Sequence, residues 1–261
     1  AQKVENVINN NIELSELTFK NGILLIIPSI NYNLYLDSIT LNFLNTAFKD
    51  AILKYQAPKD KIIIGGFSLG GMNAIRYVEL SKENPNSTSI NPVAVYGIDP
   101  PLDLARIYYS FKRIKELNFS EVAVNEAKDY LAKLNKQFGG SPKEVPNIYS
   151  KNSMYSKKKK GGGNAKFLMD TPIRIYSDPD IDWHLKERHT DLYDINALDQ
   201  TAMINELRIS GNKDAEFINA LGKGYRLNGM RHPHSWSLAE PNELMDWIIE
   251  KLNRNGDTAH N

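Results

Sequence analysis

Short runs of branched aliphatic residues alternate with stretches of helical periodicity along this chain, and that alternation restricts the fold more than any other feature. The runs lie at residues 61–65, 93–97, 172–176 and 215–220, and residues 23–27 are five consecutive branched aliphatics. Such runs are typical of strands buried on both faces. The segments between them carry apolar residues at helical spacing. We therefore predict an α/β fold with a mostly parallel, doubly wound sheet.

Residues 103–168 interrupt this alternation. Two segments within them, 104–117 and 122–138, have the spacing of amphipathic helices, and a loop containing glycine and proline follows. The strand pattern resumes only after this stretch. We therefore predict a core made of residues 1–102 and 169–261, with 103–168 inserted as a helical lid over the sheet.

The composition excludes several classes of function. The chain has 261 residues, enough for one sizeable core, and its formal net charge of +1 gives no general field that would recruit nucleic acid. It contains no cysteine, which excludes thiol catalysis, disulfides and cysteine-ligated zinc. No apolar run approaches the roughly 20 residues of a membrane span. A small-molecule partner is the remaining expectation, and the sequence does not indicate an oligomeric state.

Two features bear on the compartment of the protein. The chain begins Ala1-Gln2-Lys3, without an initiator methionine, as a processed protein would. Together with the absence of cysteine, this favours a periplasmic or secreted location. A cytoplasmic location fits the same features.

Ser68 is the candidate nucleophile. It lies in Gly66-Phe67-Ser68-Leu69-Gly70, between a predicted strand and a predicted helix. A nucleophilic serine on such a strained turn is exposed to a cleft, and the flanking glycines let neighbouring backbone pass close by. The start of the helix offers the amide of Leu69 to a developing oxyanion. A phosphate-binding turn is the competing interpretation, but the glycine and lysine patterns of such turns are absent.

A serine hydroxyl needs a neighbouring imidazole to accept its proton. In this architecture the histidine follows the last strand, and His232 and His234 occupy that place. His232 precedes a proline, which restricts its backbone to extended conformations, so we favour His234 and keep His232 as the alternative. His184, His189 and His260 are expected to be structural or exposed.

A carboxylate is then needed to hold the imidazole in the correct tautomer. Three candidates follow the predicted strand at 172–176, namely Asp178, Asp180 and Asp182. Asp180 has the usual offset from the strand, so we choose it and leave the other two as alternatives. Asp99 is a further candidate, since the end of the preceding strand can also reach the histidine.

A second oxyanion donor is expected from the loop that follows residues 23–27. The backbone amide of Ile30, or that of Asn31, is the candidate, and the Tyr32 hydroxyl could contribute.

Together these motifs resemble the α/β-hydrolase superfamily. The likeness rests on the Gly-Phe-Ser-Leu-Gly-Gly segment around Ser68, on Asp180 beyond a later strand, and on His234-Ser235-Trp236 before the closing helix. Bacterial serine esterases with Gly-Phe-Ser-x-Gly-Gly and a terminal His-Ser-Trp look most similar. The resemblance implies an ester or related acyl substrate, an acyl-serine intermediate, and neither cofactor nor metal. One feature departs from the family: only one helix fits before the serine strand where helix–strand–helix is usual, so we expect a shortened sheet.

The resulting expectation is a carboxylic-ester hydrolase. In it Ser68 attacks the ester, His234 shuttles the proton, Asp180 orients His234, and the amides of Leu69 and Ile30 bind the oxyanion. A serine peptidase or an acyltransferase on the same scaffold, a non-catalytic binding protein of this fold, and a phosphate- or nucleotide-binding α/β protein are the alternatives. The sequence does not separate them, because a fold does not determine a substrate.

Overall fold

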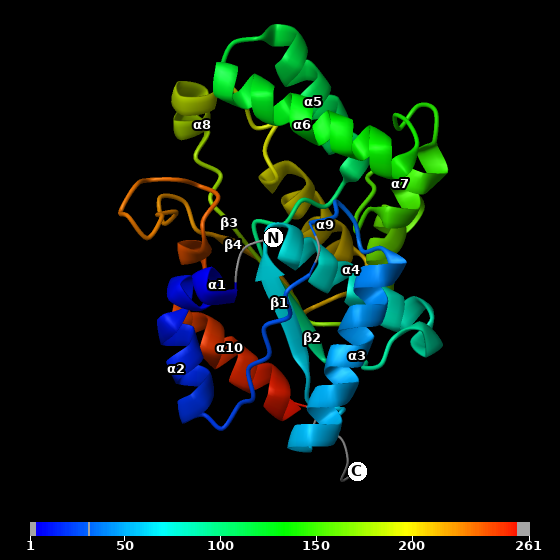
Figure 1. Ribbon diagram of the computed structural model, residues 1–261, viewed down its shortest axis with the longest axis vertical. Coiled ribbons are helices and arrows are strands. Elements are labelled where there is room, and N and C mark those ends of the chain that lie inside the picture. The colour runs from blue at the N-terminus through cyan, green and yellow to red at the C-terminus, as the bar shows by residue number, and fades with distance from the viewer. Residues whose placement is uncertain (1–3, 31, 255–261) are drawn as a thin grey trace.

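The computed structural model describes residues 4–30 and 32–254. Its centre is a sheet of four parallel strands in the order β1-β2-β3-β4. The strands are β1 (Ile63–Phe67), β2 (Ala94–Ile98), β3 (Ile173–Ser177) and β4 (Ala215–Asn219). Each lies within two residues of its predicted position, and because all are parallel their carboxyl ends share one edge of the sheet (Figure 1).

Helices connect and cover these strands. They are α1 (Val4–Asn10), α2 (Ile12–Lys20), α3 (Ser38–Tyr55), α4 (Leu69–Glu83), α5 (Leu104–Leu117), α6 (Glu121–Phe138), α7 (Pro146–Asn152), α8 (Ile181–Arg188), α9 (Ala197–Ile209) and α10 (Pro241–Arg254), with the 3-10 turns η1 (Pro85–Ser87), η2 (Lys160–Leu168) and η3 (Trp236–Leu238). No helix in the described part of the chain is long and apolar enough to span a membrane.

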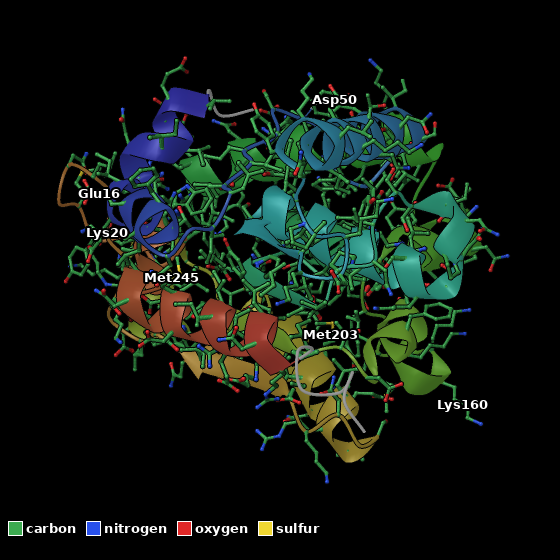
Figure 2. All side chains as sticks on the ribbon, turned by 90° about the horizontal axis from the view of Figure 1, so that it is seen from below. Glu16, Lys20, Asp50, Lys160, Met203 and Met245 are labelled. Carbon is green, nitrogen blue, oxygen red and sulfur yellow. The ribbon has the colours of Figure 1, made fainter. Side chains whose placement is uncertain are left out.

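Both faces of the sheet are covered, as the alternation of strands and helices predicts. One face packs against α4 and α9, where Ile75 and Met203 meet Ile175 of β3 in one buried cluster. The other face packs against α2 and α10, with Trp247 and Leu14 in a second cluster. Figure 2 shows α3, marked by Asp50, and α10, marked by Met245, on opposite sides of the sheet. The fold is therefore a doubly wound parallel α/β sheet.

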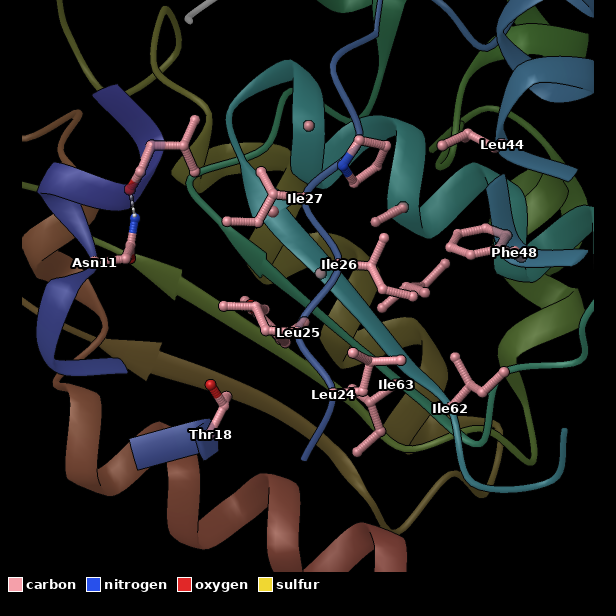
Figure 3. A pocket seen from close by; sticks show the side chains of 18 of the residues that line it. Asn11, Thr18, Leu24, Leu25, Ile26, Ile27, Leu44, Phe48, Ile62 and Ile63 are labelled. Carbon is pink, nitrogen blue, oxygen red and sulfur yellow. Dashed lines mark hydrogen bonds between the residues drawn. The ribbon is translucent and has the colours of Figure 1, made fainter. Parts of the chain in front are cut away.

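Residues 23–27 do not form the strand that we predicted. The segment runs along the outer edge of β1 (Figure 3), but its only backbone hydrogen bond within the described residues is the one from the Ile23 amide to Thr18, at 2.9 Å. Leu24 and Leu25 are more than 40% exposed. An aliphatic run predicts contact with an apolar surface, not a hydrogen-bonded neighbour, and here the segment meets the sheet only through side chains. The sheet of the described residues is thus one strand shorter than the sequence predicts, and β1 is its edge.

The helical segment between β2 and β3 divides into two parts. Helices α5 and α6 form an antiparallel pair beyond the carboxyl ends of the strands (Figure 1). Asp103 and Ser120 cap their amino ends through backbone amides, and Arg106 of α5 pairs with the buried Asp199 of α9 at 2.6 Å. The later part belongs to the main core, since Tyr155 and Leu168 pack in the cluster under α4 and α9. The α5–α6 pair is joined to the same cluster through Leu104, Leu134 and Phe138, although its helices lie beyond the carboxyl ends of the strands.

Candidate active site

Ser68 occupies a strained turn between β1 and α4. β1 ends at Phe67 and α4 begins at Leu69, so Ser68 is the single residue between them. Its φ of 54° and ψ of −123° are unusual for a residue with a side chain; such backbone costs about 1–3 kcal/mol and persists only where the surroundings enforce it. The Ser68 amide donates to Ile98 O at 2.9 Å, which ties the turn to β2.

Two glycines make this turn sterically possible. A Cβ on Gly66 would lie 2.6 Å from the backbone carbon of Gly70, and a Cβ on Gly71 would lie 2.6 Å from the Gly66 oxygen. A Cβ on Gly70 would meet nothing within 4 Å. The close approach is therefore between residue 66 and the peptide bond that joins residues 70 and 71. It requires glycine at positions 66 and 71, whereas position 70 has room for a side chain.

Ser68, His234 and Asp99 form a continuous chain of hydrogen bonds. His234 Nε2 lies 2.9 Å from Ser68 Oγ, and His234 Nδ1 lies 2.6 Å from Asp99 Oδ2. The Phe67 ring packs against the imidazole with centroids 4.4 Å apart. Because a carboxylate accepts, Nδ1 carries the proton and Nε2 is left free to accept from the serine. Of the two candidate histidines, it is His234 that the fold brings to Ser68.

Asp99 lies at the end of β2, the strand next to β1. Its backbone also has a positive φ, 46°, and its second carboxylate oxygen accepts a hydrogen bond from Gln200 Nε2 at 2.9 Å. Burial by itself raises the pKa of Asp99, but the hydrogen bond and charge of His234, together with the Gln200 bond, outweigh burial and hold that pKa below its ordinary value. Asp99 is therefore a carboxylate that faces the imidazole.

The structure does not bring Asp180 to His234. The Asp180 carboxylate caps α8 by accepting from the Trp183 amide at 2.9 Å, and it pairs with Arg231 at 2.7 Å. Asp178 also pairs with Arg231, at 2.8 Å, and accepts from two backbone amides. Asp182 is exposed. The Asp-Pro-Asp segment thus organises the loop of Arg231, and the position that we assigned to Asp180 is taken by Asp99.

The other histidines have different surroundings. His232 Nδ1 accepts from the His234 amide at 3.1 Å, so His232 braces the loop that carries His234. Burial, aided by nearby positive charges, lowers the pKa of His232 to about 4. Burial also lowers the pKa of His184 to about 4. His189 is exposed, and His260 lies outside the described residues.

The residues that we expect to donate to an oxyanion have the following surroundings. As the first residue of α4, Leu69 has no intrahelical acceptor for its amide, and it adjoins Ser68 at the positive end of the helix. Ile30 and Tyr32 line the same hollow as Ser68 and Leu69, but no hydrogen bond fixes the Ile30 amide. The Tyr32 hydroxyl instead lies 2.9 Å from that of Tyr130. Asn31 lies outside the described residues.

Two hollows meet at Ser68. A cleft of about 210 Å³ lies between the carboxyl end of the sheet and the α5–α6 pair, and Asp99, His234 and Ser68 line it. A longer groove of about 640 Å³ follows the outer edge of β1 beneath residues 24–27 (Figure 3).

The edge of β1 gives this longer groove a polar floor. The Val93 amide donates to Ile62 O, and the Ser68 amide donates to Ile98 O. The backbone groups of Ile62 and Ser68 therefore face β2. Since successive residues of a strand point their backbone groups to opposite sides, Ile63, Gly65 and Phe67 turn theirs toward the groove. No backbone partner for these three lies on that side within the described residues. The side chains that line the groove are therefore mainly apolar, but the edge of β1 also presents unpaired backbone groups to it.

The comparisons with known proteins assign no family. The chain matches no protein-family model, and no curated protein matches it significantly. Within residues 4–30 and 32–254, no group of three or more His, Asp or Glu side chains is arranged to hold a metal ion.

Two residues of the site were missed at the level of sequence. Gln200 is fully buried and supports Asp99 from α9, and Phe67 packs on the His234 ring. A signal for Asp99 did exist, because it ends the strand that follows the serine strand in sequence. Neighbouring parallel strands place their carboxyl ends side by side. Asp99 at the end of β2 is therefore nearer to the serine turn at the end of β1 than a residue that follows β3.

Proposed function

We propose that this protein is a serine hydrolase of the α/β-hydrolase type that cleaves a carboxylic ester through an acyl-serine intermediate. The observation that carries the proposal is the chain of two short hydrogen bonds, 2.9 Å from Ser68 to His234 and 2.6 Å from His234 to Asp99. The strained backbone of Ser68 supports it, because strain at a serine between a strand and a helix is characteristic of a nucleophile turn.

In the proposed reaction Ser68 Oγ attacks the ester carbonyl carbon while its proton passes to His234 Nε2. The carbonyl oxygen becomes an oxyanion beside the Leu69 amide, where the start of α4 stabilises the negative charge. Collapse of this intermediate breaks the carbon–oxygen bond to the alcohol, which leaves with the proton from His234. Throughout, Asp99 stabilises the imidazolium and fixes its tautomer.

A water molecule completes the cycle. It attacks the acyl-serine carbonyl and gives a proton to His234, and the second collapse releases the acid and returns that proton to Ser68 Oγ. The α5–α6 pair acts in this proposal as a lid that separates the cleft from bulk water, which strengthens the electrostatic interactions inside.

Covalent labelling tests the nucleophile directly. A fluorophosphonate should add one adduct to the intact protein, and peptide mapping should place it on Ser68. Ser68→Ala should abolish the adduct and lower turnover of p-nitrophenyl acetate by roughly four orders of magnitude or more. Ser29→Ala is the matched control, since Ser29 is an exposed serine of the loop that follows residues 23–27. An unlabelled protein, or an adduct that survives Ser68→Ala, would reject the proposal.

A further inference from the structure

The cleft beside Ser68 has two unlike walls. One wall is mainly apolar and comes from the lid pair and the loop before α3, with Leu34, Phe111 and Leu134 among its side chains and Glu126 as a charged one. The other is polar and comes from α8 and the loop before α10, with Arg188 and His232. A substrate in this cleft meets both surfaces at once.

The proposed reaction fixes which part of the substrate faces which wall. His234 returns its proton to the leaving alcohol, so the alcohol lies on the side of His234. That side is the polar one, because the His234 amide is bonded to His232 Nδ1. The carbonyl oxygen faces the Leu69 amide, and the Leu69 side chain packs on the apolar cluster that contains Leu34 and Leu134. The acyl group therefore faces the lid.

Two hydrogen-bond donors converge on the polar wall without an acceptor between them. A neutral imidazole has one acceptor nitrogen, and in His232 that nitrogen is Nδ1, which accepts from the His234 amide. His232 Nε2 therefore carries a proton, and it lies 3.5 Å from Arg188 Nη2, which is also a donor. The described part of the chain supplies no acceptor for this His232 proton. An oxygen atom from a ligand would satisfy both groups.

The charge at this point favours an anion. Glu126 of the lid, which also lines the cleft, pairs with Arg188 through Nη1 at 3.1 Å, and Nη2 is the nitrogen that lies beside His232. Around His232, by contrast, burial and the positive charges of Arg226, His234 and Arg188 all oppose protonation. A negatively charged oxygen placed there gains from the permanent positive charges of Arg188 and Arg226.

We propose that the substrate is an ester of a short apolar acid whose alcohol portion carries a carboxylate, bound between Arg188 and His232. This inference rests on the proposed function. The planar guanidinium suits a carboxylate, and the cleft of about 210 Å³ is smaller than the 300–1,000 Å³ usual for drug-sized ligands. The acid is therefore short, and it packs against Leu34, Phe111 and Leu134.

A pair of esters tests the recognition of the alcohol. 4-Carboxyphenyl butyrate and 4-carbamoylphenyl butyrate share the acyl group and nearly the same shape, and they differ in the charge of the leaving group. The measurement is the ratio of the kcat/KM values of the two esters, because kcat/KM includes the step in which the alcohol leaves. The kcat values are less informative: both esters form the same acyl-serine, so their kcat values become equal when its hydrolysis limits turnover. Arg188→Gln should lower the carboxyl-to-carbamoyl ratio about tenfold or more, the effect expected of a charge-assisted hydrogen bond.

Matched variants make the result specific. Lys186→Gln removes a positive charge from the same helix at a side chain that is 83% exposed, and its ratio should equal that of the unaltered protein. Arg188→Lys keeps the positive charge, so its carboxyl-to-carbamoyl ratio should lie between those of Arg188→Gln and the unaltered protein. Circular dichroism checks that each variant is folded. An Arg188→Gln ratio equal to that of Lys186→Gln would overturn the carboxylate site.

Chain length tests the acyl wall separately. Butyryl esters should be cleaved faster than decanoyl esters of the same alcohol, because the short cleft ends at the lid. A preference for decanoyl esters that Ile26→Asp abolishes would place the acyl group in the groove along β1 and overturn this part of the inference. Failure of Ser68 labelling would instead reject the proposed function and this inference with it, whereas Ser68-dependent cleavage with an unchanged ratio would reject only the carboxylate site.

Discussion

The side-chain amide of Gln200 donates to the oxygen of Asp99 that does not face His234, at 2.9 Å, while Asp99 holds the imidazole with its other oxygen. The same Gln200 nitrogen also donates to Pro100 O at 3.0 Å, which fixes the orientation of the amide. Both of its partners are acceptors, so nitrogen and oxygen of this side chain cannot exchange places. Gln200 is fully buried. It is a positioning residue, which sets the plane of the Asp99 carboxylate.

Gln200→Leu should therefore lower kcat about tenfold and leave KM nearly unchanged, because it removes one hydrogen bond to a charged group without touching the cleft near the substrate. The decisive measurement is a double-mutant cycle with Asp99→Asn. If Gln200 acts through Asp99, Gln200→Leu should have little further effect on kcat in the Asp99→Asn background. Equal losses in both backgrounds would show a general structural role. Thr201→Ala, on the same helix, is the control.

The two candidate acids give a clear contrast between variants. Asp99→Asn should lower kcat by roughly four orders of magnitude, because an amide at this place favours the wrong imidazole tautomer. Asp180→Asn should leave kcat within a few-fold and lower the free energy of unfolding by about 1 kcal/mol or less, because asparagine still caps α8 and only the ion pair with Arg231 is lost. The measurements are steady-state kinetics and urea unfolding. The reverse order of kcat losses would return the role to Asp180.

The sequence predicts the architecture well and the carboxylate partner of His234 poorly, for a physical reason. Strands and helices follow from the local pattern of apolar residues, so β1 to β4 and the helices α5 and α6 lie where that pattern places them. The acid depends on which strands are neighbours and on which carboxylates already have other partners. Arg231 forms ion pairs with Asp178 and Asp180, although it lies more than 50 residues away in the sequence. The sequence around the Asp-Pro-Asp segment contains no signal that predicts these pairs.

The segment at 23–27 fails for a related reason. Its apolar pattern is as strong as that of any strand in the chain, yet it makes no ladder with β1. Apolarity reports how much a segment gains from leaving water, while ladder formation also requires a register and a backbone approach that the pattern does not encode. By contrast, Gly66 and Ser68 could be identified from the sequence, because a strained turn between strand and helix requires particular residue types at a fixed spacing.

The glycines after Ser68 should differ sharply in tolerance. Gly71→Ala places a Cβ 2.6 Å from the Gly66 oxygen, which forces the serine turn apart, so we expect a loss of several kcal/mol in stability or failure to fold. Gly70→Ala meets open space and adds a better helix former in the first turn of α4. It should unfold at the same or a slightly higher urea concentration. Thermal and urea unfolding of the two variants checks this, and equal destabilisation would contradict the steric account of the turn.

Stability should fall on acidification because of His184 and His232. Burial lowers the pKa of each to about 4, from 6.5 for an ordinary imidazole. The unfolded chain therefore binds these protons at a higher pH than the folded chain does. The resulting stability is fully present above about pH 6.5 and is lost as the pH falls through about 4. Each imidazole contributes a slope of at most about 1.4 kcal/mol per pH unit in this window.

Urea unfolding between pH 4 and 7.5 measures this slope. In the His184→Gln, His232→Gln double variant the free energy of unfolding should depend less steeply on pH between about 4 and 6.5, because neither glutamine binds a proton. His189→Asn is the control: His189 is exposed, and asparagine tolerates its positive φ of 53°. Its slope should match that of the unaltered protein. If the free energy of unfolding of the double variant depended on pH as steeply as that of the control, both imidazoles would be protonated as readily in the folded chain as in the unfolded one. The polar wall of the cleft would then be more accessible to water than its burial indicates.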